Sequence, residues 1–322
     1  MNEQLTIKQH YVWRHYLKPW LQTPTDKRIW TCLLKHNKVN IIGLMDVAQA
    51  SSFYKVEELN QSQIDFLKSF IATQSQKVRE LGYEMLKAYE LYSLYMKGLR
   101  EGNTSITSIP EIEKKLKVIE INTFEQLNCI VENEGKSLID CRSIEDVKAL
   151  SKDELSFSFM YLVVQYLRTR GMKEGFVSSM AERPVMMEIG EKTWPFVVFL
   201  MANNLWHSTM AKDDYRFVIV KNSSSTPFIT GDQPVINDKD DITDEEGMTQ
   251  ELELYYPLSP ECALLVKFDD GPRYEETSVG QDWVDEMNKK IWHHASYHVF
   301  GSDKKVLDDL LNEVGCSLIS SK

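Results

Sequence analysis

The spacing of apolar residues changes near residue 213, and this change limits the folds that the chain can adopt. From about Ser62 to Arg100, apolar residues recur every three or four positions, which predicts helix. Beyond residue 213 they form short runs, of which Phe217–Val220 and Ala263–Val266 are typical of strands. Separate helical and strand-forming regions of this kind indicate an α+β fold.

A smaller β unit is predicted near the N-terminus. Arg28–Leu34 and Val39–Gly43 flank the polar turn His36–Lys38, which is typical of a β-hairpin. The chain is long enough to bury one large core, so we expect a single domain over 1–322. Its expected parts are a small N-terminal motif and hairpin (1–60), a long helical middle (61–212) and a C-terminal mixed or antiparallel sheet with a flanking helix (213–322).

Helix ends are predicted from capping residues, glycine and proline. Thr123–Gln126 and Ser151–Glu154 both have the capping-box pattern, so a helix is expected to begin at each. Gly82 is the expected break in the helix that starts near Ser62. A further helix is expected from Pro195 to Met210, with the proline in its first turn.

The charge distribution limits the classes of partner. The net charge of −11 argues against a general nucleic-acid binder. Residues 1–50 nevertheless hold seven Lys and Arg against three Asp and Glu, whereas residues 232–286 hold seventeen Asp and Glu against three Lys and Arg. The simplest expectation is that these opposite charges neutralise each other in the folded chain.

Neither a membrane span nor a disulfide framework is expected. The five cysteines are scattered without C-x-x-C spacing, which is typical of reduced, mostly buried thiols in a cytoplasmic protein. The opening residues Met1–Gln4 are polar, and no apolar segment of a signal peptide follows them. The uncharged stretch Thr193–Ala211 contains Asn203, Asn204 and His207, so we interpret it as a buried core helix.

Two short segments, Gln9–Arg14 and Phe228–Val235, place polar residues among apolar ones. His10 and Arg14 are four residues apart and on a helix would share a face, where they could hold an anion such as phosphate. Asp232 lies in a glycine-containing turn and could act as a base, a ligand or an orienting group. Alternatively, both segments make structural hydrogen bonds, with Asp232 in an Asx-type turn where it accepts backbone N–H bonds.

No metal and no cofactor are predicted. His293 and His294 are adjacent and would point in different directions on a helix, and a helix end separates His294 from His298. The chain has no glycine-rich phosphate loop of the Walker A or G-x-G-x-x-G type. Ser223–Ser225 lacks the G-x-S-x-G frame of a serine nucleophile.

The two polar segments resemble motifs of a prokaryotic family, DUF4238, whose name records that its function is unknown. Members open with Q-H-Y-V-P-R-x-x-L and later carry F-I-T-S-D-x-P-V, P-L-S-P and a helix with an asparagine and alanine frame. The chain departs from these motifs at Trp13, Gly231 and Gln233, where the family has Pro, Ser and Asn. The resemblance implies an architecture and candidate residues, but no reaction. The four motifs match in order at Gln9, His10, Tyr11, Val12, Arg14 and Leu17; Phe228, Ile229, Thr230, Asp232, Pro234 and Val235; Pro257–Pro260; and Asn288–Ala295.

One hypothesis is that the matching residues form an active site. Arg14 would bind phosphate, Asp232 would orient or activate, and His10 would act as acid or base near neutral pH, with Thr230 beside them. These residue types fit a hydrolase of the phosphodiesterase or ribonuclease kind, with nucleic acid or another phosphate-containing substrate, in a toxin or phage-defence setting. Further residues expected to bind the substrate are Gln9, Asn288 and Ser259.

The alternative hypothesis is a non-enzymatic sensor or protein-interaction module. The same polar residues would then form a buried network that fixes the N-terminal motif to the sheet. The helical middle would supply the surface for a partner.

Overall fold

The computed structural model describes residues 4–23, 25–101, 110–244 and 249–319, with the side chains of residues 110 and 315–319 left out. The chain divides into two compact units, which we call the helical unit and the sheet unit. The helical unit consists of Met1–Gln9, Ala50–Asn133 and Met172–Ser208, and the sheet unit of His10–Gln49, Glu134–Gly171 and Thr209–Lys322. The single-domain organisation over 1–322 stays a prediction.

The helical unit is built on the pair α1 (Gln61–Ala72) and α2 (Gln76–Arg100). The break between them falls at residues 73–75, so the prediction of a break at Gly82 is wrong. Gly82 lies inside α2, where an added Cβ would be 3.1 Å from Ile71 of α1. The glycine therefore serves the close packing of the two helices and does not end either of them.

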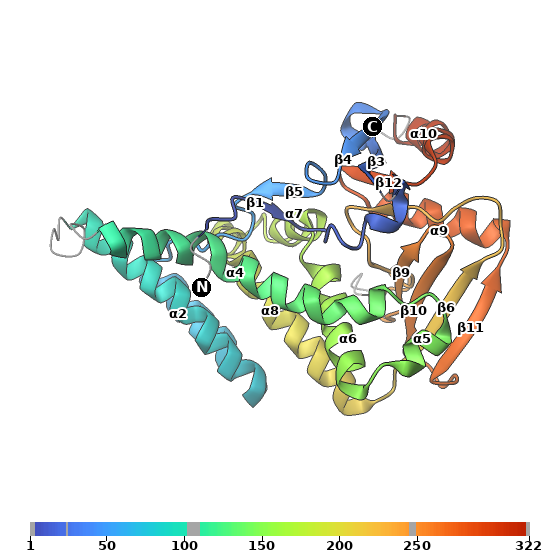
Figure 1. Cartoon of the computed structure of the whole chain (residues 1–322). Helices are drawn as coiled ribbons and strands as arrows, with labels where there is room; N and C mark the ends of the chain where they lie inside the picture. Colours follow the sequence, from blue (N-terminus) through green and yellow to red (C-terminus); the bar gives the residue numbers. More distant parts are fainter. Residues whose placement is uncertain (1–3, 24, 102–109, 245–248, 320–322) are drawn as a thin grey trace. The chain divides into compact units, whose positions relative to one another are not determined.

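A second helical pair follows from α4 (Pro110–Ile139), which forms a hairpin with α2 (Figure 1). Thr123 lies inside α4, and its hydroxyl donates to the Ile119 carbonyl oxygen at 2.7 Å. The predicted helix start at Thr123–Gln126 is therefore wrong, because the helix already runs through it. At Ser151–Glu154 the prediction is confirmed, since both reciprocal capping bonds form.

The remaining long helix of this unit, α8 (Pro184–Lys212), follows the short helix α7 (Arg170–Ser178). Pro195 lies inside α8, so its predicted place in a first turn is wrong; Pro184 takes the first position instead. Most residues from Trp194 to Leu200 are buried, as expected of a core helix. Over the described residues, no helix combines the length and apolar character needed to cross a membrane.

The sheet unit contains two five-stranded sheets. The first has the order β11-β6-β10-β9-β8, in which β11 runs parallel to β6 and the other pairs are antiparallel. Helix α9 (Gln281–His294) lies beside this sheet (Figure 1), and its apolar residues Val284, Met287 and Ile291 belong to a buried cluster that includes residues of both sheets. The strands are β6 (Arg216–Asn222), β8 (Ile236–Asn237), β9 (Leu254–Ser259), β10 (Cys262–Lys267) and β11 (Tyr274–Val279).

The second sheet joins the N-terminal hairpin to strands from the other end of the chain. The predicted hairpin is confirmed as β3 and β4, which pair antiparallel. Strand β12 lies between β3 and β7, and α10 (Lys304–Ile319) follows it. The members are β2 (Leu21–Thr23), β3 (Asp26–Leu33), β4 (Lys38–Gly43), β7 (Thr230–Gly231) and β12 (His298–Gly301).

The shorter elements complete an α+β fold. Strands β1 (Lys8–His10) and β5 (Gln49–Ser51) form a two-stranded sheet, and η1 (Lys18–Trp20) and η2 (Leu34–His36) are single 3-10 turns. Helices α5 (Ile144–Ala149) and α6 (Lys152–Leu167) belong to the sheet unit. The predicted class, with N-terminal β structure, a helical middle and a C-terminal mixed sheet with helices, is confirmed.

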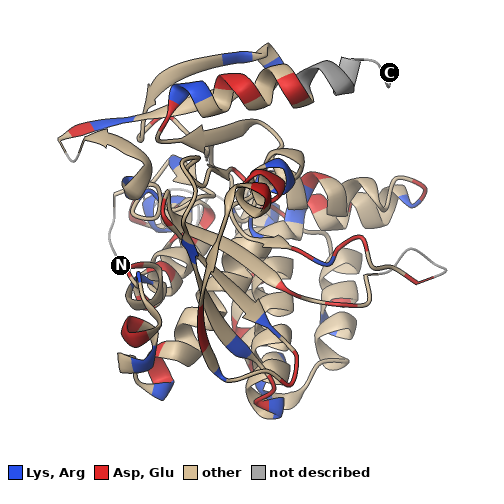
Figure 2. Ribbon diagram, turned by 90° about the vertical axis from the view of Figure 1, so that its right-hand side faces the viewer, with Lys and Arg blue, Asp and Glu red and all other residues tan. Residues whose placement is uncertain are grey.

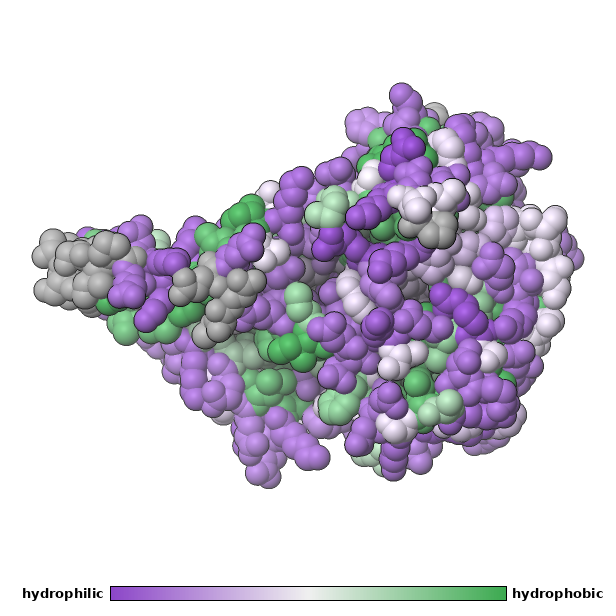
Figure 3. All heavy atoms as spheres, in the orientation of Figure 1, coloured by the Kyte–Doolittle hydropathy of each residue, from purple (hydrophilic) through white to green (hydrophobic). Residues whose placement is uncertain are grey.

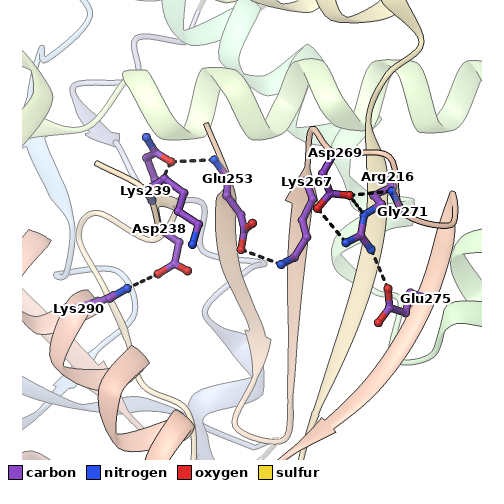
Figure 4. A network of polar contacts seen from close by, with 10 residues as sticks. Arg216, Asp238, Lys239, Glu253, Lys267, Asp269, Gly271, Glu275 and Lys290 are labelled. Carbon is purple, nitrogen blue, oxygen red and sulfur yellow. Dashed lines mark hydrogen bonds and ion pairs between the residues drawn. The ribbon is translucent and has the colours of Figure 1, made fainter. Parts of the chain in front are cut away.

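Acidic residues of the sheet unit pair with basic residues of the same unit. Arg216 binds Asp269 and, at 2.7 Å, Glu275, while Lys267 binds Glu253 at 3.1 Å (Figure 4). Basic and acidic positions are both spread along the ribbon (Figure 2). The basic partners of Asp269, Glu275 and Glu253 lie outside residues 1–50, so these three charges are neutralised by neighbouring residues of the C-terminal sheet.

Candidate functional site

Asp232 is buried behind β12 and holds the loop that leads into this strand. The residue is 3% exposed, and its carboxylate accepts hydrogen bonds from the backbone N–H groups of Ser296 (2.9 Å), Tyr297 (2.9 Å) and His298 (3.1 Å). Burial raises the pKa of Asp232 to about 6, while these three donors act to lower it. Asp232 thus accepts from backbone N–H groups, as in the alternative, but these donors lie in a distant segment and not in an Asx-type turn.

Thr230 points away from that loop, into a buried group of tyrosines. Its hydroxyl lies 2.6 Å from the Tyr16 hydroxyl. The Tyr16 ring stacks on Tyr256 with 4.6 Å between ring centroids, and the Tyr256 hydroxyl lies 2.9 Å from that of Tyr161. All four residues are buried, and burial raises the pKa of Tyr16 and Tyr256 far above the ordinary value. Thr230 is therefore part of a chain of neutral hydroxyl groups.

His10 and Arg14 lie close together, although neither is on a helix. His10 ends β1 and Arg14 lies in the turn that follows, where Arg14 Nη1 contacts Met45 Sδ. Burial, assisted by the charges of Arg14 and Arg168, lowers the pKa of His10 to about 4. The half-buried His10 ring is thus neutral at physiological pH, and its Nε2 has no hydrogen-bond partner among the described residues.

The end of α6 connects the two polar motifs. Sequence reasoning missed this connection and the residues that make it. Arg168 is 0% exposed and donates to Gln165 Oε1 at 2.6 and 3.2 Å, and Gln165 Nε2 donates to the Tyr11 carbonyl oxygen at 2.9 Å. Thr169 donates to Gln233 Oε1. A signal was available, since Gln165, Arg168 and Thr169 are polar residues at the end of a strongly apolar helix.

Two of the three predicted substrate-binding residues bond to nearby backbone within the sheet unit. Asn288 accepts from the Ile229 N–H and donates to the Pro227 carbonyl oxygen, both at 3.0 Å. Ser259 accepts from the Glu261 N–H at 3.2 Å and donates to the Glu261 carboxylate at 3.1 Å. Both side chains therefore fix local backbone geometry.

Gln9, the third, belongs to the helical unit. It is 0% exposed, donates to the Ile121 carbonyl oxygen and accepts from the Tyr54 N–H, both at 2.7 Å. The predicted catalytic residues of the sheet unit thus take part in three different groups of contacts. Thr230 joins the tyrosines, Asp232 joins residues 296–298, and His10 and Arg14 lie by Met45.

The histidines near the end of α9 are engaged with other groups. His294 Nε2 lies 2.7 Å from Asp240 Oδ2, and His294 Nδ1 lies 2.8 Å from the Lys290 carbonyl oxygen. His298 Nδ1 lies 3.8 Å from the Asp232 carboxylate. Within the part of the chain that the structure describes, no group of three or more His, Cys, Asp and Glu side chains is arranged to hold a metal ion.

The fold and these contacts define an α+β protein whose two polar motifs bond largely to its own backbone and aromatic residues. The profile of the family described as "Protein of unknown function (DUF4238)" matches residues 8–305, and the chain belongs to this family. Neither the curated proteins nor the solved structures include a match to the chain.

Proposed function

We propose that the protein acts by binding, as a non-enzymatic sensor or protein-interaction module, and that its polar motifs form a buried structural network. The Asp232 carboxylate carries this proposal. A general base must reach a proton of the substrate, but Asp232 is 3% exposed and accepts three backbone hydrogen bonds. The backbone bonds of Asn288 and Ser259 support the same interpretation.

The helical unit offers a surface for a partner. A cavity of about 510 Å³ lies between α2 and α4, and Leu91 and Leu94 at its edge are 50% and 69% exposed. Figure 3 shows apolar side chains along α2 near the end of this hairpin. On both helices the lining residues recur at three- and four-residue steps, which fits an amphipathic helix of a partner. The apolar lining residues are Leu91, Leu94, Tyr95, Ile112, Leu116 and Ile119.

Charge at this groove favours a helix with an acidic flank. Lys97, Glu101 and Lys115 line the groove; Lys97 pairs with Glu101 at 3.9 Å, whereas the exposed Lys115 makes no ion pair with any carboxylate in the described ranges. An acidic residue beside the apolar stripe of the partner would meet Lys115.

A hydrolase of the phosphodiesterase or ribonuclease kind, in a toxin or phage-defence setting, is the second candidate. One observation favours it. His10 is neutral at physiological pH, its Nε2 has no hydrogen-bond partner among the described residues, and the Arg14 charge is close by. The guanidinium would bind a phosphate, but His10 Nε2 is itself buried and the lowered pKa makes the imidazole a weak base, so this candidate stands second.

Stability and activity measured on the same variants separate the two candidates. The binding proposal expects no hydrolysis of RNA or bis(p-nitrophenyl) phosphate by the wild-type protein, and a large loss of stability in Asp232→Ala. The exposed Asp270→Ala is the control for removal of one carboxylate. Hydrolysis that disappears in His10→Ala, at unchanged stability, would overturn the proposal and establish the hydrolase.

We further propose the cytoplasmic location that the cysteine pattern predicts. The thiols of Cys32, Cys141 and Cys262 are buried and free, and Cys129 is exposed. Buried thiols that form no disulfide support a reducing compartment. The side chain of Cys316 lies outside the described residues.

A further inference from the structure

We infer that the sheet unit contains a binding site for a small organic anion, in a cavity beside the end of α9. The cavity has a volume of about 350 Å³. Its walls come from four elements: the last residues of α9, the loop before β12, the turn η2 and helix α10. The lining residues are Leu34, Lys35, Asn37, Trp292, His293, Ala295, Ser296 and Leu311.

The lining residues define the charge of the ligand. They include Lys35 and His293 but neither Asp nor Glu. Lys35 makes no ion pair with a carboxylate among the residues that the structure describes; its Nζ lies 4.4 Å from the centroid of the Tyr297 ring. A lysine that rests on an aromatic face retains its positive charge and its N–H donors for a ligand. An anionic group is therefore the complement of this wall.

Neutral polar groups provide further hydrogen bonds. Asn37 and Ser296 line the same cavity as Lys35. An amide and a hydroxyl can both donate to a phosphate or carboxylate oxygen. The Arg170 guanidinium lies 4.0 Å from the centroid of the same Tyr297 ring on which Lys35 rests.

The remaining lining indicates that the ligand also has an apolar part. Trp292 is 2% exposed, and Leu34, Ala295 and Leu311 contribute further apolar surface. A small-molecule site typically has a mainly apolar wall that carries a small number of polar side chains. The ligand class is thus an anionic head group, phosphate or carboxylate, attached to a small apolar body.

The polar motif Phe228–Val235 gives this cavity a fixed shape. Asp232 accepts from the N–H groups of Ser296 and Tyr297 at 2.9 Å, which holds the loop that carries Ser296. On the other wall, the Leu34 N–H donates to the Tyr297 carbonyl oxygen at 3.0 Å. A cavity held in this way loses little entropy when a ligand binds. Asp232 is accordingly a positioning residue for the site.

The inference rests on the proposed binding function, and its test uses two ligands that differ in the head group. Phenyl phosphate and phenylacetate are titrated into the full chain by calorimetry at low salt, with inorganic phosphate alone as the third probe. We expect one of the two phenyl ligands, or both, to bind with a stoichiometry of one and more tightly than inorganic phosphate. Lys35→Gln should weaken that binding about tenfold, as expected for loss of one charge-assisted hydrogen bond.

Lys38→Gln is the matched control, because Lys38 is exposed at the start of β4 and does not line the cavity. It removes the same charge and should change the affinity less than twofold. Binding of phenyl phosphate alone identifies a phosphate head group, and binding of phenylacetate alone identifies a carboxylate.

Three results would overturn the inference: no binding of either phenyl ligand, equal affinity in wild type and Lys35→Gln, or inorganic phosphate binding as tightly as phenyl phosphate. Release of free phosphate from phenyl phosphate has a different meaning. If that release is lost in Lys35→Gln, the cavity is a site but the protein is an enzyme, so the proposed function fails while the cavity assignment holds.

Discussion

The Tyr16 hydroxyl lies 2.6 Å from the Thr230 hydroxyl, although 214 positions separate the two residues in the sequence. This bond joins the N-terminal motif to β7 inside a buried tyrosine group. Tyr16→Phe should lower the free energy of unfolding by about 1–2 kcal/mol, because the Thr230 hydroxyl loses its buried partner. Urea denaturation measures the change.

A double-mutant cycle checks whether the loss belongs to this bond. Thr230→Val removes the second hydroxyl at similar volume, and the double variant should lose less stability than the sum of the single variants. Additive losses would show that the two hydroxyls are not coupled.

Asp232→Ala should be strongly destabilising. The variant leaves the half-buried N–H groups of Ser296, Tyr297 and His298 without their acceptor, at a cost of about 1 kcal/mol or more for each group. We expect a total loss of at least about 3 kcal/mol by chemical denaturation. The exposed Asp270→Ala should change the free energy of unfolding by less than about 0.5 kcal/mol.

Acidification should destabilise the protein through His10. Its pKa is lowered from 6.5 to about 4 in the folded state, so the unfolded chain binds more protons between these values. The contribution of His10 to stability is present above pH 6.5 and is lost as the pH falls toward 4. His10→Gln should therefore lose less stability than the wild type between pH 7 and pH 5, measured by urea denaturation.

Asp232 has the opposite effect on the pH dependence of stability over the same pH range. Its pKa is raised from 3.8 to about 6, so its contribution to stability is present below pH 3.8 and is lost as the pH rises through 6.

In the test of His10, the exposed His36→Gln is the control for the loss of an imidazole. A pH dependence identical in wild type and His10→Gln would contradict the assignment of a lowered pKa to His10.

Two glycines in helices should respond differently to the same substitution. An added Cβ at Gly135 would lie 2.2 Å from Cγ of the buried Tyr161, so Gly135→Ala should destabilise the sheet unit by several kcal/mol or prevent folding. At Gly175, within α7, an added Cβ meets nothing within 4 Å. Gly175→Ala should stabilise the protein by up to about 1 kcal/mol. Thermal melts of both variants test this contrast.

The cysteines should differ in reactivity by exposure. Cys129 is exposed, whereas burial raises the pKa of Cys32 and Cys262 to about 11 and that of Cys141 to about 12. In a Cys316→Ser background, the Cys129 thiol should react rapidly with a disulfide reagent. The three buried thiols, Cys32, Cys141 and Cys262, should react only after unfolding. Rapid reaction of a second thiol in the native protein would contradict the burial of the other three.

Local sequence patterns were sufficient for much of the fold. The hairpin of β3 and β4 and the capping box at Ser151 depend on residues close together in the chain, and both form as predicted. Thr123 and Gly82 show where such reasoning fails. Each lies inside a long helix, and at Gly82 packing against Ile71 of α1 decides its role.

The candidate site, too, could be predicted from the sequence only in part. The alternative for Asp232, acceptance from backbone N–H groups, needs only the turn chemistry of its own motif. Its donors lie 64 to 66 positions further along the chain, and no local pattern identifies them. Arg168 and Tyr16 were missed for this reason, because their contacts with the motifs are set by the packing of α6 and the sheets.

The strand order also determines when the second sheet can form during synthesis on the ribosome. Strand β3 (Asp26–Leu33) is made early, whereas its partner β12 (His298–Gly301) is made much later. Strand β2 can pair with the first half of β3 at once, but the Trp30–Leu33 half has no neighbour on that edge until β12 leaves the exit tunnel. This half of the nascent hairpin therefore exposes unpaired backbone groups through most of translation, and such an edge favours chaperone binding.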